Sequence, residues 1–194
     1  MNTLLFLHCA LPALFVSSEE IQYLLKGQKL TGSGGSSIWN TVVSSLSADG
    51  NTVTIGRALH DGVNGVKSGL VQVYAYDGSQ WLKKGNDFDV ENAGNKSGIA
   101  VSSSSDGNII AIRSRNGKDS YKIDSGYVRV FSYDGTQWNQ MGANINGESA
   151  GDLFGRIVSI SSNGHIIAIG AVINDGNGNK WTCASILLRW NSMG

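Results

Sequence analysis

The sequence repeats itself with a period of 57 residues, and this repeat limits the folds that are open to the chain. The hexapeptide at 76–81 (YDGSQW) returns at 133–138 (YDGTQW), so that Trp81 and Trp138 are 57 residues apart. The same offset separates three turn dipeptides, Asp49-Gly50, Asp106-Gly107 and Asn163-Gly164. So many identities at one spacing are typical of a tandem repeat, in which each unit packs against its neighbours.

Within each period, apolar residues alternate with polar ones in the way that a half-buried β-strand requires. Three runs show this pattern, at 51–56, 108–113 and 165–170. An Asp-Gly or Asn-Gly dipeptide precedes each run and predicts a two-residue type I′ hairpin, with positive φ at both turn residues. Further along the period, a second turn at Asp77-Gly78 or Asp134-Gly135 predicts a return into a fourth strand that carries Trp81 or Trp138.

Four antiparallel strands in each period are typical of one blade of a β-propeller. We therefore predict an all-β fold of propeller-type blades over residues 19–194, each blade a four-stranded antiparallel meander. The repeats lie at about 28–85, 86–142 and 143–194. Residues 20–27 are predicted to be an N-terminal fourth strand, because the sequence at 22–27 matches that at 80–85. About three blades are fewer than the roughly four to eight that close a ring, so we expect an incomplete or open ring.

An open arc of blades leaves two apolar blade faces uncovered, and exposed faces of this kind mark an interface. Two arcs related by a twofold axis would complete a ring of about six blades. We therefore expect the chain to form a homodimer or to be the remainder of a longer propeller.

The composition agrees with many short strands joined by tight turns, because glycine accounts for 26 of the 194 residues and proline for one. The chain carries 15 basic and 15 acidic side chains, and its formal net charge is +0. This balance provides no basic surface of the kind that binds nucleic acid, so the sequence predicts no nucleic-acid partner.

The first residues of the sequence predict export from the cell. Residues Leu4–Val16 form an apolar run of thirteen residues, shorter than the ~18–20 that a membrane-spanning helix needs. Ser17 and Ser18 follow, so we predict a signal peptide at 1–18, no transmembrane helix, and a secreted or cell-surface protein. A buried first strand or helix is the alternative. The sequon Asn95-Lys96-Ser97 predicts glycosylation of Asn95.

The third repeat carries motifs of a known family. Phe154-Gly155 is followed by a strand and then by Gly170-Ala171, and residues 147–155 read Gly-Glu-x-x-Gly-Asp-x-x-Gly. This pattern resembles the FG-GAP repeats of integrin α-subunit propellers and, more closely, the integrin-α-like repeats of surface and secreted proteins. The resemblance covers about residues 22–194, and it implies a β-propeller that acts outside the cell.

The first two repeats depart from the family pattern. The second has Ser97-Gly98 and Arg113-Ser114 where the motif has Phe-Gly and Gly-Ala, and the first has Asn40-Thr41 in place of Phe-Gly. Integrin repeats also carry Asp-x-Asp-x-Asp-Gly calcium loops between their first two strands, where this chain has a short turn. The resemblance therefore does not imply calcium binding here.

Few side chains in the sequence suggest a chemical site. Asp87, Asp89 and Glu91 are weak candidates for a calcium site, because carboxylate oxygens suit a hard cation. Solvated loop residues are the alternative. The equivalent residues one repeat later also have oxygen ligands, and they are Asn144, Asn146 and Glu148. No catalytic residue and no cofactor are predicted.

The recurring aspartates and aromatic residues have structural explanations. Each aspartate of an Asp-Gly turn is predicted to cap its own backbone. The aromatic residues that recur in register are predicted to pack between blades, with a stacking platform for sugars as the alternative. They are Tyr76, Trp81, Tyr133 and Trp138.

The sequence favours a non-catalytic extracellular recognition or adhesion module that binds a protein or glycan through its long loops. The tight turns are predicted to share one end of the blades and the long loops the other. One alternative is a glycan-active propeller enzyme. Such an enzyme would need two or more acidic side chains gathered at one site. The acidic residues available outside the turns are Asp87, Asp89, Glu91, Glu148 and Asp152. Another alternative is a truncated propeller fragment without independent activity.

Overall fold

The computed structural model describes residues 26–30, 42–89, 92–115, 125–147, 153–171 and 184–189. These residues form thirteen β-strands and no helix, so the predicted all-β class is confirmed. The predicted signal peptide and most of the predicted N-terminal fourth strand at 20–27 lie outside the described residues.

The strands are short and follow one another without a crossover through a helix. In chain order they are β1 (Val42–Leu46), β2 (Thr52–Arg57), β3 (Leu70–Tyr76), β4 (Trp81–Lys83), β5 (Phe88–Asp89), β6 (Ala100–Ser103), β7 (Ile109–Ser114), β8 (Tyr127–Tyr133), β9 (Trp138–Gln140), β10 (Ile145–Asn146), β11 (Ile157–Ile160), β12 (Ile166–Ala171) and β13 (Ala184–Arg189).

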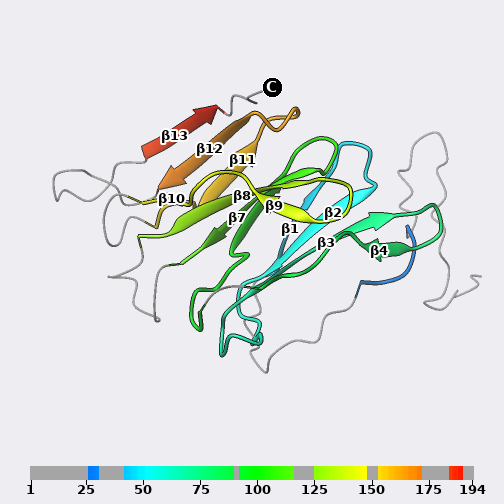
Figure 1. Cartoon of the computed structure of the whole chain (residues 1–194), viewed down its shortest axis with the longest axis horizontal. Helices are drawn as coiled ribbons and strands as arrows, with labels where there is room; N and C mark the ends of the chain where they lie inside the picture. The colour runs from blue at the N-terminus through cyan, green and yellow to red at the C-terminus, as the bar shows by residue number, and fades with distance from the viewer. Residues whose placement is uncertain are drawn as a thin grey trace, which may run out of the picture.

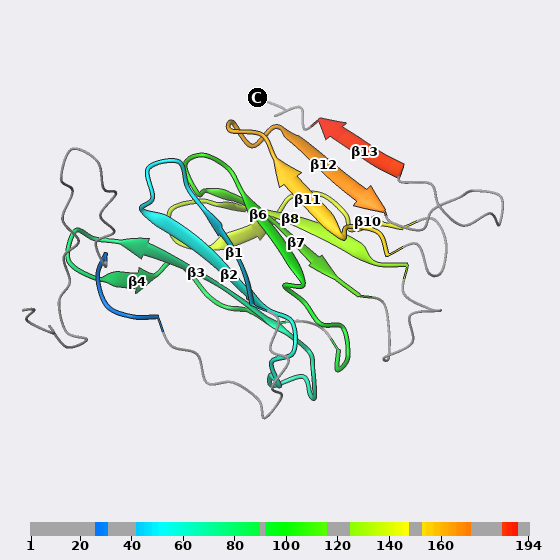
Figure 2. The same ribbon diagram turned by 180° about the vertical axis from the view of Figure 1, so that it is seen from behind.

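Three antiparallel sheets of meander strands make up the fold, and Figure 1 shows them side by side in chain order. The first sheet has the order β1-β2-β3-β4, and the second repeats it with β6, β7, β8 and β9. In the third sheet, β11, β12 and β13 are described. The described sheets do not close into a barrel or a ring, and Figure 2 shows the second sheet between the first and the third. They are therefore open, propeller-like blades.

The strands recur at the spacing that the sequence predicts. The second strands of the three sheets begin at Thr52, Ile109 and Ile166, each 57 residues after the one before. The third strands, β3, β8 and β13, keep the same offset.

The fourth strand of each complete sheet is divided into two parts. In the first sheet, β4 pairs with the outer half of β3, while β5 pairs with its inner half. Tyr74 pairs with Lys83 and Val71 with Phe88, so the fourth strand has two more residues than β3 over this stretch. The extra residues form a bulge before β5, and β9 and β10 repeat the division in the second sheet.

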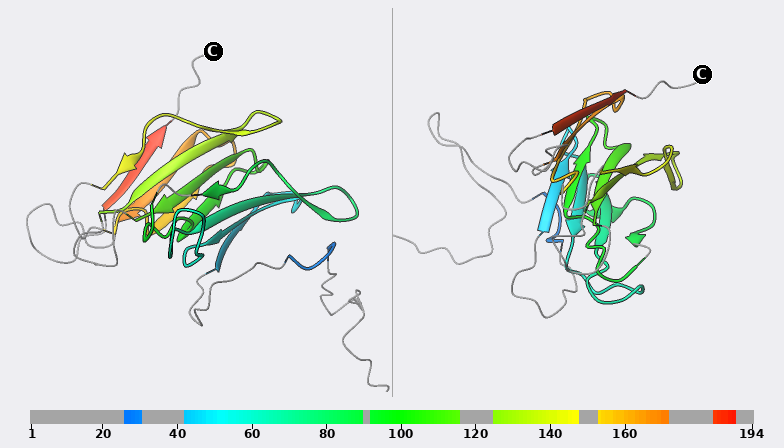
Figure 3. Two further views of the ribbon diagram at one scale, coloured as in Figure 1. Left: turned by 60° about the horizontal axis from the view of Figure 1, so that its bottom comes forward. Right: turned by 90° about the vertical axis from the view of Figure 1, so that its left-hand side faces the viewer.

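The core lies between the sheets, because alternate strand residues face one neighbour or the other. Val71 and Val73 of the first sheet pack against Ile110 and Ile112 of the second, and all four are buried. Residues on the opposite face of the second sheet pack in the same way against the third, with Val128 and Val130 meeting Ile167 and Ile169. Figure 3 shows this stacking of sheet on sheet from two further directions.

The hairpin turns correct one prediction. A type I′ turn needs positive φ at both central residues, yet Asp49, Asp106 and Asn163 are not among the residues with positive φ. The chain instead makes a four-residue loop at 48–51, in which the Gly50 amide donates to the Ser47 carbonyl and Gly50 alone takes φ +67°. The second turn is not type I′ either, because Gly78 has φ +103° while Asp77 and Ser79 do not have positive φ.

The side chains of the turn explain why its aspartate keeps negative φ. The Asp49 carboxylate accepts a hydrogen bond from the Asn51 amide at 2.9 Å and another from the Ser47 hydroxyl at 2.6 Å. Ser47 in turn accepts from the Thr52 amide at 2.8 Å, which closes the loop. The predicted capping by aspartate is therefore confirmed. The equivalent turn of the second sheet repeats this capping with Ser104 and Asp106, and that of the third sheet repeats it with Ser161 and Asn163.

These hydrogen bonds stabilise the ionised aspartates. Those from Ser47 and Asn51 lower the pKa of Asp49 to about 2, from an ordinary value of 3.8. Partial burial alone would raise the pKa of Asp106, but hydrogen bonds from Ser104 and Asn108 outweigh it and the pKa is lowered. The amides of Gln80 and Ser79 lower the pKa of Asp77, and those of Gln137 and Thr136 lower the pKa of Asp134.

A lysine–glycine pair joins the first sheet to the second. The Lys84 carbonyl accepts a hydrogen bond from the Trp138 indole at 2.8 Å. The Lys84 ammonium donates to the Gly107 carbonyl at 3.0 Å and lies 5.0 Å from the centre of the Tyr133 ring. Burial lowers the pKa of Lys84, and the charges of Asp106 and Asp49 offset part of this effect. Gly85, with φ +75°, lies against the edge of Trp138, where a Cβ would collide with the ring.

A second lysine–glycine pair makes the same contacts on the first sheet. The Lys26 carbonyl accepts from the Trp81 indole at 2.7 Å, and the Lys26 ammonium lies 4.8 Å from the centre of the Tyr76 ring. Gly27 takes φ +71° against Trp81. We call these two arrangements the tryptophan joints. The prediction that the recurring aromatic residues pack between blades is confirmed for Tyr133 and Trp138. For Tyr76 and Trp81 it stays a prediction.

The turn aspartates predict how stability depends on pH. Because the folded pKa of Asp49 and of Asp106 lies below the unfolded value, their contribution is complete above about pH 4 and is lost as the pH falls through the folded pKa, which for Asp49 is about 2. Asn163 makes the same hydrogen bonds without a charge, so the double substitution Asp49→Asn and Asp106→Asn should keep the turns. We expect urea denaturation to show near wild-type stability at neutral pH and a smaller loss on acidification.

The corresponding double alanine variant is the control, because it removes the cap as well as the charge. It should be less stable at neutral pH too. An acid-induced loss in the asparagine variant as large as that of the wild type would contradict the assignment.

Candidate binding surface

The connections between strands divide the molecule into two ends. The tight turns at 47–51 and 77–80 lie at one end of the first sheet, because both follow strands that run toward that end. The loop at 58–69, which joins β2 to β3, lies at the opposite end. The second sheet likewise has its turns at 104–108 and 134–137 at one end. Described loops therefore gather at one end of the sheets, as the sequence predicts, and we call this the loop end.

Two loops at this end are joined by backbone hydrogen bonds. The loop at 58–69 lies along the segment at 92–98, which leads from the first sheet to the second. The Gly94 amide donates to the Val66 carbonyl, and the Lys96 amide to the Lys67 carbonyl, both at 3.0 Å. Gly69 then pairs with Ser97 in a parallel bridge. The two loops thus form one ordered unit.

The next pair of sheets repeats part of this contact. The Phe154 amide donates to the Ser125 carbonyl at 3.0 Å, which is the equivalent of the bond from Ser97 to Ser68. The Phe154 carbonyl accepts from Arg113 Nε at 2.7 Å. Phe154 itself is buried in the core between the second and third sheets.

The remaining residues of the Phe-Gly and Gly-Ala motifs also lie at close contacts or in the core. Gly155 takes φ +78° beside Val128, where a Cβ would collide. Gly170 lies opposite Ile157, and Ala171 is buried in the core. These motif residues therefore hold the sheets together and are not exposed for binding.

The tip of the first loop exposes two apolar side chains. Val63 is 88% exposed and Val66 is 65% exposed. The tip between them is ordered, because the Asp61 carboxylate accepts from the Lys67 amide at 2.8 Å and the Ser68 hydroxyl accepts from the Gly62 amide at 3.0 Å. An apolar pair held on an ordered loop is a surface suited to binding. We call Val63 and Val66 the valine tip.

Asn95, the predicted glycosylation site, lies in the same loop unit. The Asn95 carbonyl accepts from the Arg115 amide at 2.7 Å, and the residue is 7% exposed. Glycosylation there stays a prediction.

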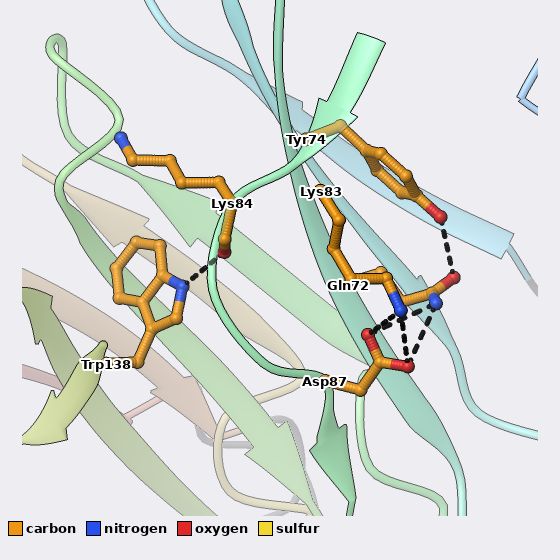
Figure 4. Close-up of polar contacts among 6 residues, drawn as sticks. All are labelled: Gln72, Tyr74, Lys83, Lys84, Asp87 and Trp138. Carbon is orange, nitrogen blue, oxygen red and sulfur yellow. Dashed lines mark hydrogen bonds and ion pairs between the residues drawn. The ribbon is translucent and has the colours of Figure 1, made fainter. Parts of the chain in front are cut away.

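A polar cluster brings the candidate acid Asp87 next to three other side chains, as Figure 4 shows. The Asp87 carboxylate makes an ion pair with Lys83 at 2.9 Å and accepts hydrogen bonds from Gln72 Nε2 at 3.2 Å. The Tyr74 hydroxyl donates to Gln72 Oε1 at 3.2 Å. Lys83 ends β4 and Asp87 precedes β5, so the ion pair closes the bulge in the fourth strand.

The second sheet shows that this cluster has a structural role. Gln140 and Asn144 occupy the positions of Lys83 and Asp87, and Gln140 Nε2 donates to Asn144 Oδ1 at 3.0 Å. A neutral pair therefore closes the equivalent bulge. The two oxygens of Asp87 are already engaged by nitrogen donors, and a cation bound there would have to displace the Lys83 ammonium.

The other candidate acids are not brought into this cluster by any described contact. The backbone of Asp89 is part of β5, but its side chain is outside the description, as are Glu91, Glu148 and Asp152. Within the part of the chain that the structure describes, no three His, Cys, Asp or Glu residues gather as a metal-binding group. The same part contains no helix long and apolar enough to cross a membrane.

The sequence patterns miss the loop unit and the valine tip. The paired recurrence of Gly69 and Gly126 is the signal that could have found them, because both take positive φ where two loop backbones meet. No family model matches this chain, and no curated protein matches it either.

The loop unit depends on the absence of a side chain at Gly69. A Cβ there would collide with the backbone nitrogen and oxygen of Ser97, and φ is +88°. Gly78 has a similar φ of +103° but nothing within 4 Å. We expect Gly69→Ala to lower the free energy of unfolding by at least about 1 kcal/mol more than the control Gly78→Ala, because only the first adds a backbone clash to the conformational cost.

Urea denaturation measures this difference, and hydrogen exchange of the Ser97 amide reports on the loop unit directly. Equal effects of the two substitutions would show that the loops do not rely on this contact.

The ion pair between Asp87 and Lys83 predicts how the protein responds to calcium. Neither added calcium nor a chelator should change the melting temperature, because the Lys83 ammonium already neutralises the site. Scanning calorimetry with calcium and with chelator tests this. A calcium-dependent rise of several degrees would contradict it and would make Asp87 and Asp89 the first residues to substitute.

Proposed function

We propose that this protein is a non-catalytic extracellular recognition or adhesion module that binds its ligand through the loop end. The single observation that carries the proposal is the valine tip. Val63 and Val66 are 88% and 65% exposed, although the loop that bears them is tied to the segment at 92–98 by backbone hydrogen bonds. Exposed apolar side chains on an ordered loop need little further ordering when a ligand binds.

The rest of the structure suits a scaffold for such loops. Sheet-on-sheet packing buries apolar residues of the strands, so the loop end is carried by the packed core. The resemblance of the third repeat to integrin-α-like repeats supports a role outside the cell, and so does the predicted signal peptide.

A protein ligand fits the valine tip better than a glycan does. Sugar-binding surfaces commonly use exposed aromatic rings, but Trp81 and Trp138 are held in the tryptophan joints by indole hydrogen bonds. The valine tip offers apolar area without an aromatic platform, which suits an apolar surface on another protein.

Binding to an array of purified extracellular protein domains, with a glycan array beside it, tests the proposal. We expect the double substitution Val63→Asp and Val66→Asp to weaken binding to a recognised domain by at least about tenfold, since charges would then enter an apolar contact. Leu82→Asp is the matched control, because Leu82 is 47% exposed but lies on β4, away from the loop end.

Three results would contradict the proposal. They are no binding to either array, equal loss of binding in the Leu82→Asp control, and binding to glycans alone, which would rule out the protein ligand. Circular dichroism establishes that each variant is folded before its binding is interpreted.

A further inference from the structure

Two outer sheet faces are not covered by any sheet of the described residues, and they carry opposite halves of an interface that the chain makes twice internally. We call the outer face of the first sheet the leading face, with Val42, Leu46, Val53 and Ile55. We call the outer face of the third sheet the trailing face, with Ile157 and Ile166. Leu46 is 59% exposed and Ile157 is 68% exposed. The register of β1, β2, β11 and β12 places each set on one side of its sheet.

The leading face is the same surface that is covered in the next two sheets. Ile55 corresponds to Ile112 and Ile169, which are both 0% exposed because another sheet lies on them. Ile55 itself is only partly buried. The leading face therefore carries apolar residues at the same positions as the covered faces of the second and third sheets. Among the described residues, no sheet lies on it.

Backbone hydrogen bonds between the turns give this interface a direction. The Ala48 amide donates to the Ser105 carbonyl at 2.8 Å, and the Ser105 amide donates to the Ser162 carbonyl at 2.9 Å. The three residues are spaced by one repeat each, so they form a ladder from sheet to sheet. Within the described residues, this ladder ends with the Ala48 carbonyl on the leading side and the Ser162 amide on the trailing side. One end accepts and the other donates.

A contact between a strand side chain and a turn glycine of the next sheet also repeats in the same direction. We call the side chain the knob and the space beside the glycine the cradle. Gly107 packs against Thr52 of the preceding sheet so closely that a Cβ would collide with it, and Gly164 packs against Ile109 in the same way. Gly50 is the equivalent cradle on the first sheet, where no atom lies closer than 3.9 Å. Ile166 is the equivalent knob on the third sheet, and it is 40% exposed. The empty cradle and the exposed knob match.

The first tryptophan joint shows where the outer strand of a sheet docked on the leading face would lie. At the second joint, Lys84 and Gly85 directly follow β4 of the sheet in front. Lys26 and Gly27 occupy the same place on the first sheet. A sheet docked on the leading face would thus meet a segment already positioned as the continuation of its outer strand.

From these matching halves, we propose that a second copy of this chain docks head to tail, its trailing face covering the leading face of the first. The Ser162 amide of one copy donates to the Ala48 carbonyl of the other, and Ile166 enters the cradle at Gly50. Two such contacts close a pair of copies into a ring of about six blades. The proposal does not depend on the ligand of the loop end.

Light scattering coupled to size exclusion tests the pairing with the full chain at micromolar concentration. We expect twice the protomer mass for the wild type. Leu46→Asp and Ile166→Asp should each weaken association by at least about tenfold, because each places a charge in an apolar contact. Both positions are exposed within one copy, so folding should be retained, and thermal melting checks it. Val63→Asp at the loop end is the matched control and should leave the mass doubled.

Mixing the two single variants distinguishes head-to-tail docking from other arrangements. Each variant retains one intact face, and the two intact faces are complementary. We expect the mixture to associate more strongly than either variant alone. Docking of two leading faces on each other would instead leave Ile166→Asp without effect, and this result would overturn the proposal.

A disulfide provides an independent readout of the ladder. In a background with Cys9 and Cys183 replaced by serine, Ala48→Cys with Ser162→Cys should link two copies under oxidising conditions. The control Ala48→Cys with Ser105→Cys should link residues within one copy, since these two are hydrogen bonded in the structure. A wild-type monomer at micromolar concentration, or an internal disulfide in the control without a link between copies in the test variant, would overturn the proposal.

Discussion

The packing of one sheet face on the next is the interaction on which the rest of the structure depends. Each sheet is a few short strands, and such a sheet is not stable unless a hydrophobic face is covered. In the second sheet, Ile110 and Ile112 of β7 form one apolar face, and Val128 and Val130 of β8 form the other. This sheet therefore needs a neighbour on both sides. The buried isoleucines between adjacent sheets, with exposures of 0 or 1%, show how completely this burial is achieved. The turns, joints and loops all serve to hold the sheets at this spacing.

The distribution of polar groups follows from the same requirement. Backbone groups at the turn end cannot be left unpaired between two packed sheets, and the ladder from Ala48 to Ser105 to Ser162 satisfies them. Hydroxyl groups complete the contact between neighbouring first strands, with Ser45 and Ser103 only 2.8 Å apart. Because these bonds run in one direction, the stack has a polarity that apolar packing alone would not impose. This polarity makes the leading and trailing faces different surfaces.

The sequence predicts the strands well because their signal is local. Alternation over 51–56 or 108–113 requires only that one side of a strand be buried, and the 57-residue offset then places every equivalent strand. The turn type was wrong because the dipeptide rule considers backbone preference alone. Hydrogen bonds from Ser47 and Asn51 to Asp49 instead favour a longer loop with a single left-handed glycine. Side-chain capping thus outweighs the preference of the Asp-Gly pair.

The loop unit and the divided fourth strand were not predicted, because both depend on contacts between distant residues. The pairing of Gly69 with Ser97 requires the first and second sheets to be stacked already, and nothing in either loop sequence specifies the other. The bulge before β5 likewise has no common residue signature, since an ion pair closes it in the first sheet and an amide pair in the second. A comparison of the repeats for identical residues cannot find two bulges that share a backbone geometry but have different side chains.

The two proposals are linked by the direction of the ladder. The ladder joins the equivalent turns of the three sheets, so these turns lie at one end of the stack and the described loops lie at the other. A second copy that docks by the same contact would place its own valine tip at that end as well. Two tips on one side of a rigid assembly would bind a surface with several ligand copies more tightly than one tip does, without any new contact. Head-to-tail docking would therefore suit an adhesion module, whereas docking of two leading faces would reverse one copy and separate the two tips.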